Sequence, residues 1–307
     1  MPVPDFPQSL DTETKSQRRS RFKRAPLPNS LTRVQQRDIE ILEALYSYRF
    51  LTTSQIESLF FNTKKRAERR LRKLYDAGLV DRIFRPVVVG SAEIIYVLSG
   101  YGVNLLSQET GVDREEINEA RLKSQNQKSL FLDHFIDINQ FRIALTLSCK
   151  TSNYAILFWK YENELKNVNE QGVLISDKVK DPENPSQKIP VSPDAFFGLE
   201  TSKGKAYFFV EIDRATMSNT RFKRKMIGYT RYWLDGAYLE KWGYKTFRTL
   251  TVTTTNRLPR LLEVTGEIKE KQLLPILYFT DSKNITHQAL FSDIWKTPND
   301  ESLKSIV

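Results

Sequence analysis

Three acidic residues lie in two short apolar runs in the second half of the sequence. Asp194 follows Pro193 near the start of VSPDAFFGLE, and Glu211 and Asp213 end the run AYFFVEID. The runs are rich in β-formers and are joined by the short segment TSKGK, so we expect two adjacent antiparallel strands. Carboxylates at positions i and i+2 of a strand share a face. The pattern therefore gathers Asp194 and Glu211 at one end of a sheet, with Asp213 as a further member.

Oxygen ligands of this kind suit one chemistry in particular. Carboxylates are the ligands that Mg²⁺ and Mn²⁺ prefer, and such an ion can activate water and stabilise a phosphoryl transition state. Asp194 and Glu211 are thus candidate metal ligands, and Asp213 joins them as a candidate catalytic residue. The alternative is a common Pro-Asp turn together with a surface ion-pair cluster of Glu211, Asp213 and Arg214, which would contribute little.

A second group of residues is cationic. The run KKRAERRLRK, from Lys64 to Lys73, holds seven basic residues and one acidic residue. Lys65, Arg69 and Arg72 follow helical i, i+4, i+7 spacing, and a second basic stripe lies beside them. A helix with such a face can enter the major groove of DNA, with its first residues near base edges. The candidate DNA-binding residues are Thr63, Lys64, Lys65, Arg66, Arg69, Arg70, Arg72 and Lys73. A solvated face or a protein-docking helix is the alternative.

The bulk composition agrees with a polyanionic partner. Lys and Arg exceed Asp and Glu by 47 to 37, which gives a net charge of +10. The excess is concentrated between Arg18 and Arg24 and between Lys64 and Lys73, which favours double-stranded DNA as the partner. One cysteine and two histidines argue against an internal disulfide or a structural zinc site.

The elements that must position the cationic run occupy the first third of the chain. Residues 1–30 carry five prolines among polar and basic residues, so we expect a flexible basic arm. Three helices follow: one ends near Arg49, one opens with a capping box formed by Thr52 with Gln55 or by Ser54 with Glu57, and one stops at Gly78. The runs LVDRIF and EIIYVLS then predict a hairpin. The stretch from Leu31 to Ser99 resembles the winged helix-turn-helix superfamily, and we assign residues 31–107 to this DNA-binding domain.

The elements that must position the carboxylates follow a polar segment at residues 108–128, which we interpret as a linker helix. Residues 129–307 predict an α/β domain with a mixed central sheet, so that the chain as a whole is of the α+β type. We expect a helix from Leu130 to Leu147 that is buried on more than one face, and a long loop at residues 177–193. His134 fits a packed or hydrogen-bonded structural role. A second helix is expected at residues 219–234. The expected strands cover residues 154–161, 194–199, 206–213, 247–254 and 275–280.

The acidic motif resembles that of the PD-(D/E)xK nuclease superfamily, in which Pro193 and Asp194 would match the Pro-Asp pair and Glu211 the second acid. The superfamily pattern calls for Lys two residues after that acid, where this chain has Asp213. In some members the basic residue has moved to the next helix. Lys225 lies one turn before Tyr229 there, a spacing that resembles RecB-like nucleases. The resemblance adds Lys225 to the candidate catalytic residues and implies Mg²⁺ or Mn²⁺ as cofactor.

The N-terminal elements together with PDAFF, FFVEIDRAT and RFKRKMIGYTRYW resemble the replication-relaxation family of plasmids and mobile elements. The resemblance implies a DNA-binding protein that acts in replication, relaxation or transposition of its element, either as a Mg²⁺-dependent endonuclease or without cutting. In the second case the nuclease core would be degenerate, and the protein would be a DNA-binding factor or transcriptional regulator that uses this core for dimerisation or partner binding. A second copy of the chain and replication or transposition proteins of the element are further candidate partners.

The sequence also bears on location. No apolar run approaches the roughly 20 residues that span a bilayer. The start of the chain lacks the apolar core of a signal peptide. We therefore expect a cytoplasmic protein without a membrane partner.

Overall fold

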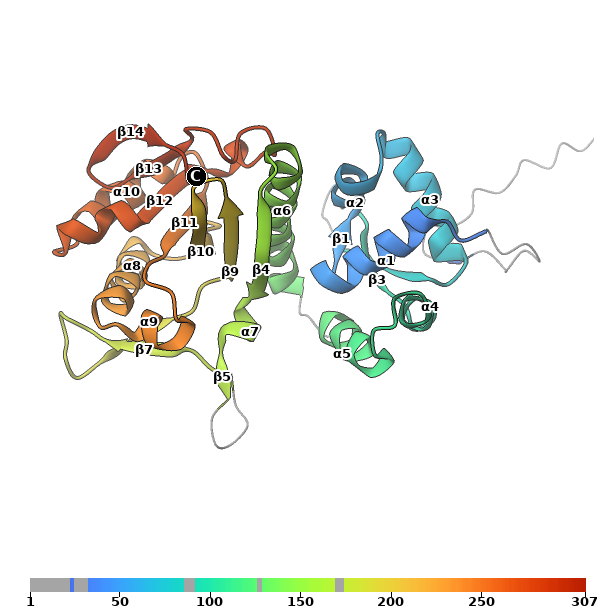
Figure 1. The fold of residues 1–307 in the computed structure, drawn as a ribbon, viewed down its shortest axis with the longest axis horizontal. Coiled ribbons are helices and arrows are strands. Elements are labelled where there is room, and N and C mark those ends of the chain that lie inside the picture. Colours follow the sequence, from blue (N-terminus) through green and yellow to red (C-terminus); the bar gives the residue numbers. More distant parts are fainter. Residues whose placement is uncertain (1–22, 25–32, 86–91, 126–128, 169–173) are drawn as a thin grey trace, which may run out of the picture.

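The structure is a computed structural model that describes residues 23–24, 33–85, 92–125, 129–168 and 174–307. The expected basic arm therefore lies outside the described residues, apart from Lys23 and Arg24, and so does most of the connection between the two strands of the expected wing. The chain forms two lobes joined along one long helix, α6 (Ser129–Ser152) (Figure 1).

The N-terminal lobe begins with three helices, α1 (Gln36–Tyr48), α2 (Thr53–Phe60) and α3 (Lys64–Asp76). A small antiparallel sheet in the order β1-β3-β2 completes it, built from β1 (Leu51–Thr52), β2 (Val80–Ile83) and β3 (Ile95–Leu98). This is the element order that the winged helix-turn-helix prediction requires. The capping box at Thr52 is present: its hydroxyl accepts from Gln55 N at 3.3 Å, and Thr52 N donates to the Gln55 side chain at 3.1 Å.

The segment after the hairpin differs from the expected linker. It folds as two helices, α4 (Gly100–Thr110) and α5 (Arg114–Gln125), separated by Gly111, whose φ of 72° ends the first. Val103, Leu106 and Ile117 are buried in the same apolar cluster as α1 and α3. These three positions hold the helices on the N-terminal lobe, although most of the segment is polar. The limits of the predicted domains stay a prediction.

The C-terminal lobe is built on a seven-stranded mixed sheet in the order β14-β13-β12-β11-β10-β9-β4. Its strands are β4 (Ala155–Tyr161), β9 (Ala195–Thr201), β10 (Gly204–Ile212), β11 (Arg248–Thr253), β12 (Leu277–Asp281), β13 (Trp295–Thr297) and β14 (Asp300–Lys304). The pairs of β11 with β10 and with β12 are parallel, and the other pairs are antiparallel. The predicted α/β class with a mixed central sheet is confirmed.

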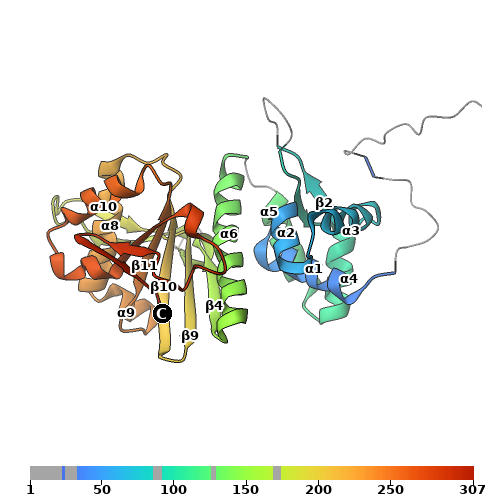
Figure 2. The ribbon, with the colours of Figure 1, turned by 90° about the horizontal axis from the view of Figure 1, so that it is seen from above.

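Helices cover both faces of this sheet (Figure 2). One face packs against α6, and the other packs against α8 (Asn219–Leu234), α9 (Ala237–Trp242) and α10 (Leu258–Gly266). Strand alternation explains the division: Phe197 and Phe208 join the α6 cluster, whereas Phe196 and Phe209 join the α8 cluster. The remaining elements are α7 (Glu162–Leu165), β5 (Asn167–Val168), β6 (Leu174–Ile175), and 3-10 helices at Lys271–Ile276 and Ser282–Asn284.

The prediction of a long loop at residues 177–193 was wrong. The stretch forms a hairpin of β7 (Asp177–Lys180) and β8 (Lys188–Val191). Val179, Ile189 and Val191 are buried between exposed neighbours, so the hairpin has an apolar face that packs on α8. A Cβ on Gly228 of α8 would come within 2.9 Å of Ile189, and this close approach explains the glycine there.

Helix α6 contributes to both lobes. The buried Asn139 side chain donates to the carbonyls of Tyr48 and Phe50 at 3.0 and 2.7 Å, and its own oxygen accepts from Tyr161 of β4 at 2.8 Å. The Phe135 ring meets the Phe50 ring edge-on at 5.0 Å. The expected burial of this helix on more than one face is confirmed. None of the helices in the described ranges is long and apolar enough to cross a membrane.

Candidate active site

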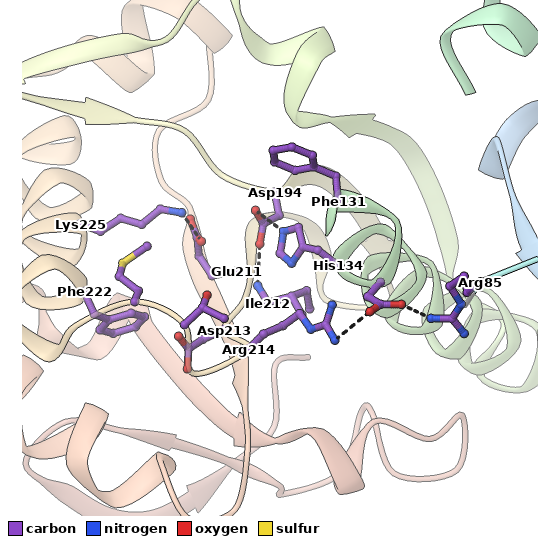
Figure 3. Close-up of a pocket in the computed structure, with 13 residues that line it drawn as sticks. Arg85, Phe131, His134, Asp194, Glu211, Ile212, Asp213, Arg214, Phe222 and Lys225 are labelled. Atoms are coloured by element: carbon purple, nitrogen blue, oxygen red, sulfur yellow. Dashed lines mark hydrogen bonds and ion pairs between the residues drawn. The ribbon is translucent and has the colours of Figure 1, made fainter. Parts of the chain in front are cut away.

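The two carboxylates singled out from the sequence lie in one cleft. Asp194 stands two residues before Phe196 and Glu211 two residues after Phe209, so strand alternation turns both toward the α8 face. The register of β9 and β10 ends at Ala195 opposite Val210, which places the two acids side by side at the end of the strand pair. Both line a cavity of about 680 Å³ (Figure 3).

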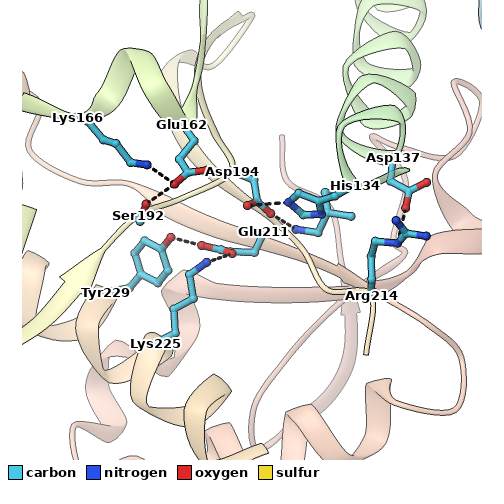
Figure 4. A network of polar contacts seen from close by, with 11 residues as sticks. His134, Asp137, Glu162, Lys166, Ser192, Asp194, Glu211, Arg214, Lys225 and Tyr229 are labelled. Atoms are coloured by element: carbon cyan, nitrogen blue, oxygen red, sulfur yellow. Dashed lines mark hydrogen bonds and ion pairs between the residues drawn. The ribbon is translucent and has the colours of Figure 1, made fainter. Parts of the chain in front are cut away.

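Glu211 is buried and has two partners on α8. The ammonium group of Lys225 donates to Oε2, and the hydroxyl of Tyr229 donates to Oε1 (Figure 4). Lys225 and Tyr229 are one helical turn apart, so a single face of α8 delivers both groups. Ser218 caps this helix by accepting from Arg221 N at 3.3 Å, which fixes where the helix begins.

The electrostatics of this pair follow from its burial. Loss of hydration raises the pKa of Glu211 to about 7, although the charge of Lys225 and the two hydrogen bonds pull it down. Burial also opposes the charge of Lys225, but Glu211 and Asp194 outweigh it and raise the pKa of that ammonium group. Lys225 is therefore cationic at neutral pH, and Glu211 changes its charge close to neutral pH.

Asp194 is fixed from two directions. Its Oδ2 accepts from Ile212 N at 2.7 Å, and its Oδ1 lies 3.0 Å from Nε2 of His134 on α6. Burial alone would raise the pKa of Asp194, but the hydrogen bond and charge of His134 and the charge of Lys225 lower it below its ordinary value. Burial opposes the protonated form of His134, yet Asp194 outweighs burial and raises the pKa of the imidazole. Asp194 is a carboxylate across the neutral range.

Asp213 lines the same cleft but has other partners. Its Oδ2 accepts from Thr253 Oγ1 at 2.7 Å and from Arg257 Nε at 2.5 Å. Arg257 also donates to the carbonyl of Met217, and it thereby ties the segment that follows β10 to the start of α10. Asp213 therefore stands near Asp194 and Glu211, while its carboxylate belongs to a separate ion pair.

Several residues of the cleft were missed by sequence reasoning. Arg214 lies 3.3 Å from Asp137 and 3.7 Å from Asp133, and Arg85, just after β2, donates to the same Asp133. Phe131, at the start of α6, also lines the cleft with 59% of its surface exposed. Arg214 follows Asp213 directly, and its neighbour was visible in the sequence, but its partners Asp133 and Asp137 on α6 were not. Arg85 and Phe131 are far from the acidic run in the chain, so no local spacing could group them with it. His134 is hydrogen-bonded as expected, but its partner is a site residue.

The donor set can be compared with the needs of a divalent cation. Asp194 and Glu211 supply carboxylate oxygens, and each of these oxygens keeps a second lone pair beside its hydrogen bond. Within the described ranges, no group of three or more His, Cys, Asp or Glu side chains is arranged to hold a metal ion. Two carboxylates nevertheless suffice for Mg²⁺, which commonly takes its other ligands from water and substrate phosphate. The residues fit that ion.

The predicted DNA-binding residues divide into two groups in the structure. Arg70 is held by Asp38 of α1, and Arg72 pairs with Asp76 one turn further along α3. The other members are exposed along α3 or at its start: Thr63, Lys64, Lys65, Arg66, Arg69 and Lys73.

Comparison with known proteins gave two matches of different kinds. No curated protein sequence matches the chain. Among solved structures, the restriction endonuclease FokI matches with a TM-score of 0.28 and 12% identity, over 81% of this chain and 42% of that chain. The alignment thus spans less than half the length of that protein. The replication-relaxation family model matches residues 42–248, which is more than half of the chain. The chain belongs to the replication-relaxation family.

Proposed function

We propose that this protein binds duplex DNA of a plasmid or other mobile element through α3 and cuts it at the Asp194 and Glu211 site with the help of Mg²⁺ or Mn²⁺. The observation that carries the proposal is the meeting of Asp194, Glu211 and Lys225 in one cleft, where the ammonium group of Lys225 is bonded to Glu211. Family membership supports a role in handling element DNA.

The division of labour follows from the contacts. Asp194 and Glu211 would hold the ion, which would supply acidification of a water molecule and positive charge beside the phosphate. Ile212 N fixes Asp194, and Tyr229 fixes Glu211, so both carboxylates are oriented before substrate arrives. Lys225 brings a positive charge to the wall of the cleft, where it stabilises the developing charge of the scissile phosphate.

The cleft also has groups suited to the rest of the DNA strand. Arg85 and Arg214 line it from the two lobes, and the exposed ring of Phe131 offers a surface on which a base can stack. Because Arg85 follows β2, the N-terminal lobe contributes a cation to the cleft that holds Asp194 and Glu211.

A second candidate function is DNA binding without cutting. The observation that favours it is Asp213, which stands where the resemblance calls for Lys and is neutralised by Arg257. In that case the scaffold serves a DNA-binding factor or transcriptional regulator, and the cleft serves binding or dimerisation.

One experiment separates the two functions. Supercoiled, linear and branched element DNA is incubated with the wild-type protein in Mg²⁺ or Mn²⁺, beside Asp194→Asn and the exposed-carboxylate control Glu263→Gln. Metal-dependent products from wild type and control but not from Asp194→Asn support cutting. If all three proteins bind the DNA and it stays intact in every lane, the result contradicts cutting and supports DNA binding without cutting.

The role of α3 is tested on its own. Replacing Lys65, Arg69 and Arg72 with Ala should abolish retardation of the duplex and leave the melting temperature unchanged, because the three side chains lie outside the apolar core of the N-terminal lobe. Unchanged affinity in this variant would remove α3 from the DNA interface.

A further inference from the structure

A separate pocket lies where the start of α1 meets α3, in the N-terminal lobe and away from the carboxylates. Its volume is about 460 Å³. Of the described residues, seven line it, and none of these seven is acidic. Five are basic: Arg37, Arg66, Arg69, Arg70 and Lys73. Four of the five belong to one face of α3, while Arg37 comes from the first turn of α1.

One wall of the pocket is fixed before any ligand binds. Asp38 of α1 is completely buried and accepts from Nε of Arg70 at 2.7 Å and from the second nitrogen of that guanidinium group. It also accepts from Gln35 N at 2.7 Å, and Arg70 donates in turn to the carbonyl of Arg33 at 3.1 Å. The guanidinium group of Arg70 is therefore fixed in the free protein, so little side-chain entropy is lost when this group binds a ligand.

An aromatic ring forms another part of the pocket lining. The guanidinium group of Arg37 lies 5.2 Å from the centroid of the Phe61 ring, which follows α2 and also lines the pocket. Three elements thus converge, with cations on two of them. The ion pair with Asp38 offsets the charge of Arg70. The other four basic side chains that line the pocket give it an excess of positive charge.

We propose that this pocket binds a phosphate group, and that the group is a backbone phosphate of the duplex bound by α3. The proposal rests on the proposed DNA binding and extends it to α1. Arg and Lys are the side chains that recognise phosphate oxygens. Arg70 donates to Asp38 and Arg33 through Nε and one terminal nitrogen, so its other terminal nitrogen is the group that can reach the phosphate. The contact sets the register of α3 on the duplex and reads no base.

Arg37 is the position at which the pocket can be tested most sharply. Arg37 is exposed and belongs to α1, so Arg37→Ala leaves both α3 and the apolar core unchanged. Arg70→Ala is a poor choice because it would leave the buried Asp38 without its partner. Arg260→Ala, which removes an exposed arginine from α10 in the other lobe, is the matched control.

The first arm measures affinity for cognate and unrelated duplexes as a function of salt. Arg37→Ala should weaken both by a similar factor and reduce the slope of log affinity against log salt by about 0.9, the value for one phosphate contact. A duplex with one neutral methylphosphonate at the contacted position should show the same loss with wild type and no further loss with Arg37→Ala. Arg260→Ala should behave as wild type.

The second arm titrates wild type with inorganic phosphate and pyrophosphate and follows the guanidinium NMR signals of Arg37 and Arg70. If wild type binds DNA and Arg37→Ala keeps its affinity and salt slope, the pocket proposal is overturned while DNA binding stands. If DNA does not bind but pyrophosphate saturates the pocket, the proposed function fails and the ligand is a free phosphate compound, so the backbone assignment fails as well. Absence of binding in both arms overturns both.

Discussion

The ammonium group of Lys225 on α8 donates a hydrogen bond to the carboxylate of Glu211 on β10. A helix therefore supplies the cation that the strand lacks at Asp213. The strand position two residues after Glu211 is instead part of an ion pair with Arg257. The charge that the resemblance places on the strand is thus present in the cleft, but it comes from another element.

Lys225→Met should abolish DNA cutting and preserve DNA binding. Its ammonium group is proposed to stabilise the scissile phosphate, and loss of one such group costs on the order of 100- to 1000-fold in rate. Single-turnover cleavage and gel retardation measure the two properties. Lys223→Met is the matched control, because Lys223 lies on the same helix and pairs with Glu267 outside the cleft. Equal cutting by both variants would contradict the role of Lys225.

Glu211 should titrate near neutral pH. Burial raises its pKa from 4.5 to about 7, and NMR of the side-chain carboxyl carbon follows the titration directly. Because the charge and hydrogen bond of Lys225 lower this pKa, Lys225→Met should shift the midpoint upward, whereas Lys223→Met should leave it in place. A midpoint close to 4.5 in wild type would disprove the burial argument.

The same shift has a consequence for stability. The pKa of Glu211 is higher in the folded protein than in the unfolded chain, so folding takes up a proton. The stabilisation from this proton is complete below about pH 4.5 and is lost as the pH rises through about 7. Urea unfolding of wild type and Glu211→Gln across this window should show the difference in pH dependence, since the amide does not titrate.

Arg70→Ala should destabilise the protein strongly. Its removal leaves the carboxylate of Asp38, which is completely buried, without its cationic partner. Breaking a buried pair in this way costs about 3 kcal/mol in the free energy of unfolding. The double variant Asp38→Asn with Arg70→Met should recover part of that loss in urea unfolding. A fully stable Arg70→Ala protein would contradict the importance of this ion pair.

Cys149 should be unreactive in the native protein. Burial raises the pKa of its thiol to about 11, so the reactive thiolate is scarce at pH 8. A chromogenic disulfide reagent should react slowly with the folded chain and quickly in denaturant. Rapid reaction under native conditions would mean that α6 opens readily at this position.

Local signals in the sequence predicted α1, α2, α3, α6 and α8 as well as the carboxylate pair, but not α4, α9 or α10. The helix expected at residues 219–234 has those bounds, because Ser218 caps it and its apolar residues follow helical spacing. The placement of Asp194 beside Glu211 followed from strand alternation and a short connection. The hairpin at residues 177–193 was missed because its prolines and charges obscured an alternation of only three buried residues.

What could not be predicted depends on long-range contacts. Arg257 pairs with the carboxylate of Asp213, and His134 pairs with that of Asp194. Both partners come from elements that are distant in the chain. The basic stripe on α3 was visible in the sequence, but the buried partner of Arg70 was not, because Asp38 is one of several acidic residues along α1. Partner choice is set by packing, and packing is not a local property of the sequence.

Helix α6 has a consequence for how the chain can vary. The helix supplies buried side chains to the clusters of both lobes, and Asn139 satisfies carbonyl groups in one lobe while it accepts from Tyr161 in the other. A chain cut before Ser129 would expose an apolar flank of α6 to water and leave the end of α1 without its donors. The two lobes therefore depend on the same helix for burial, and loss of either should weaken the cooperative unfolding of the other.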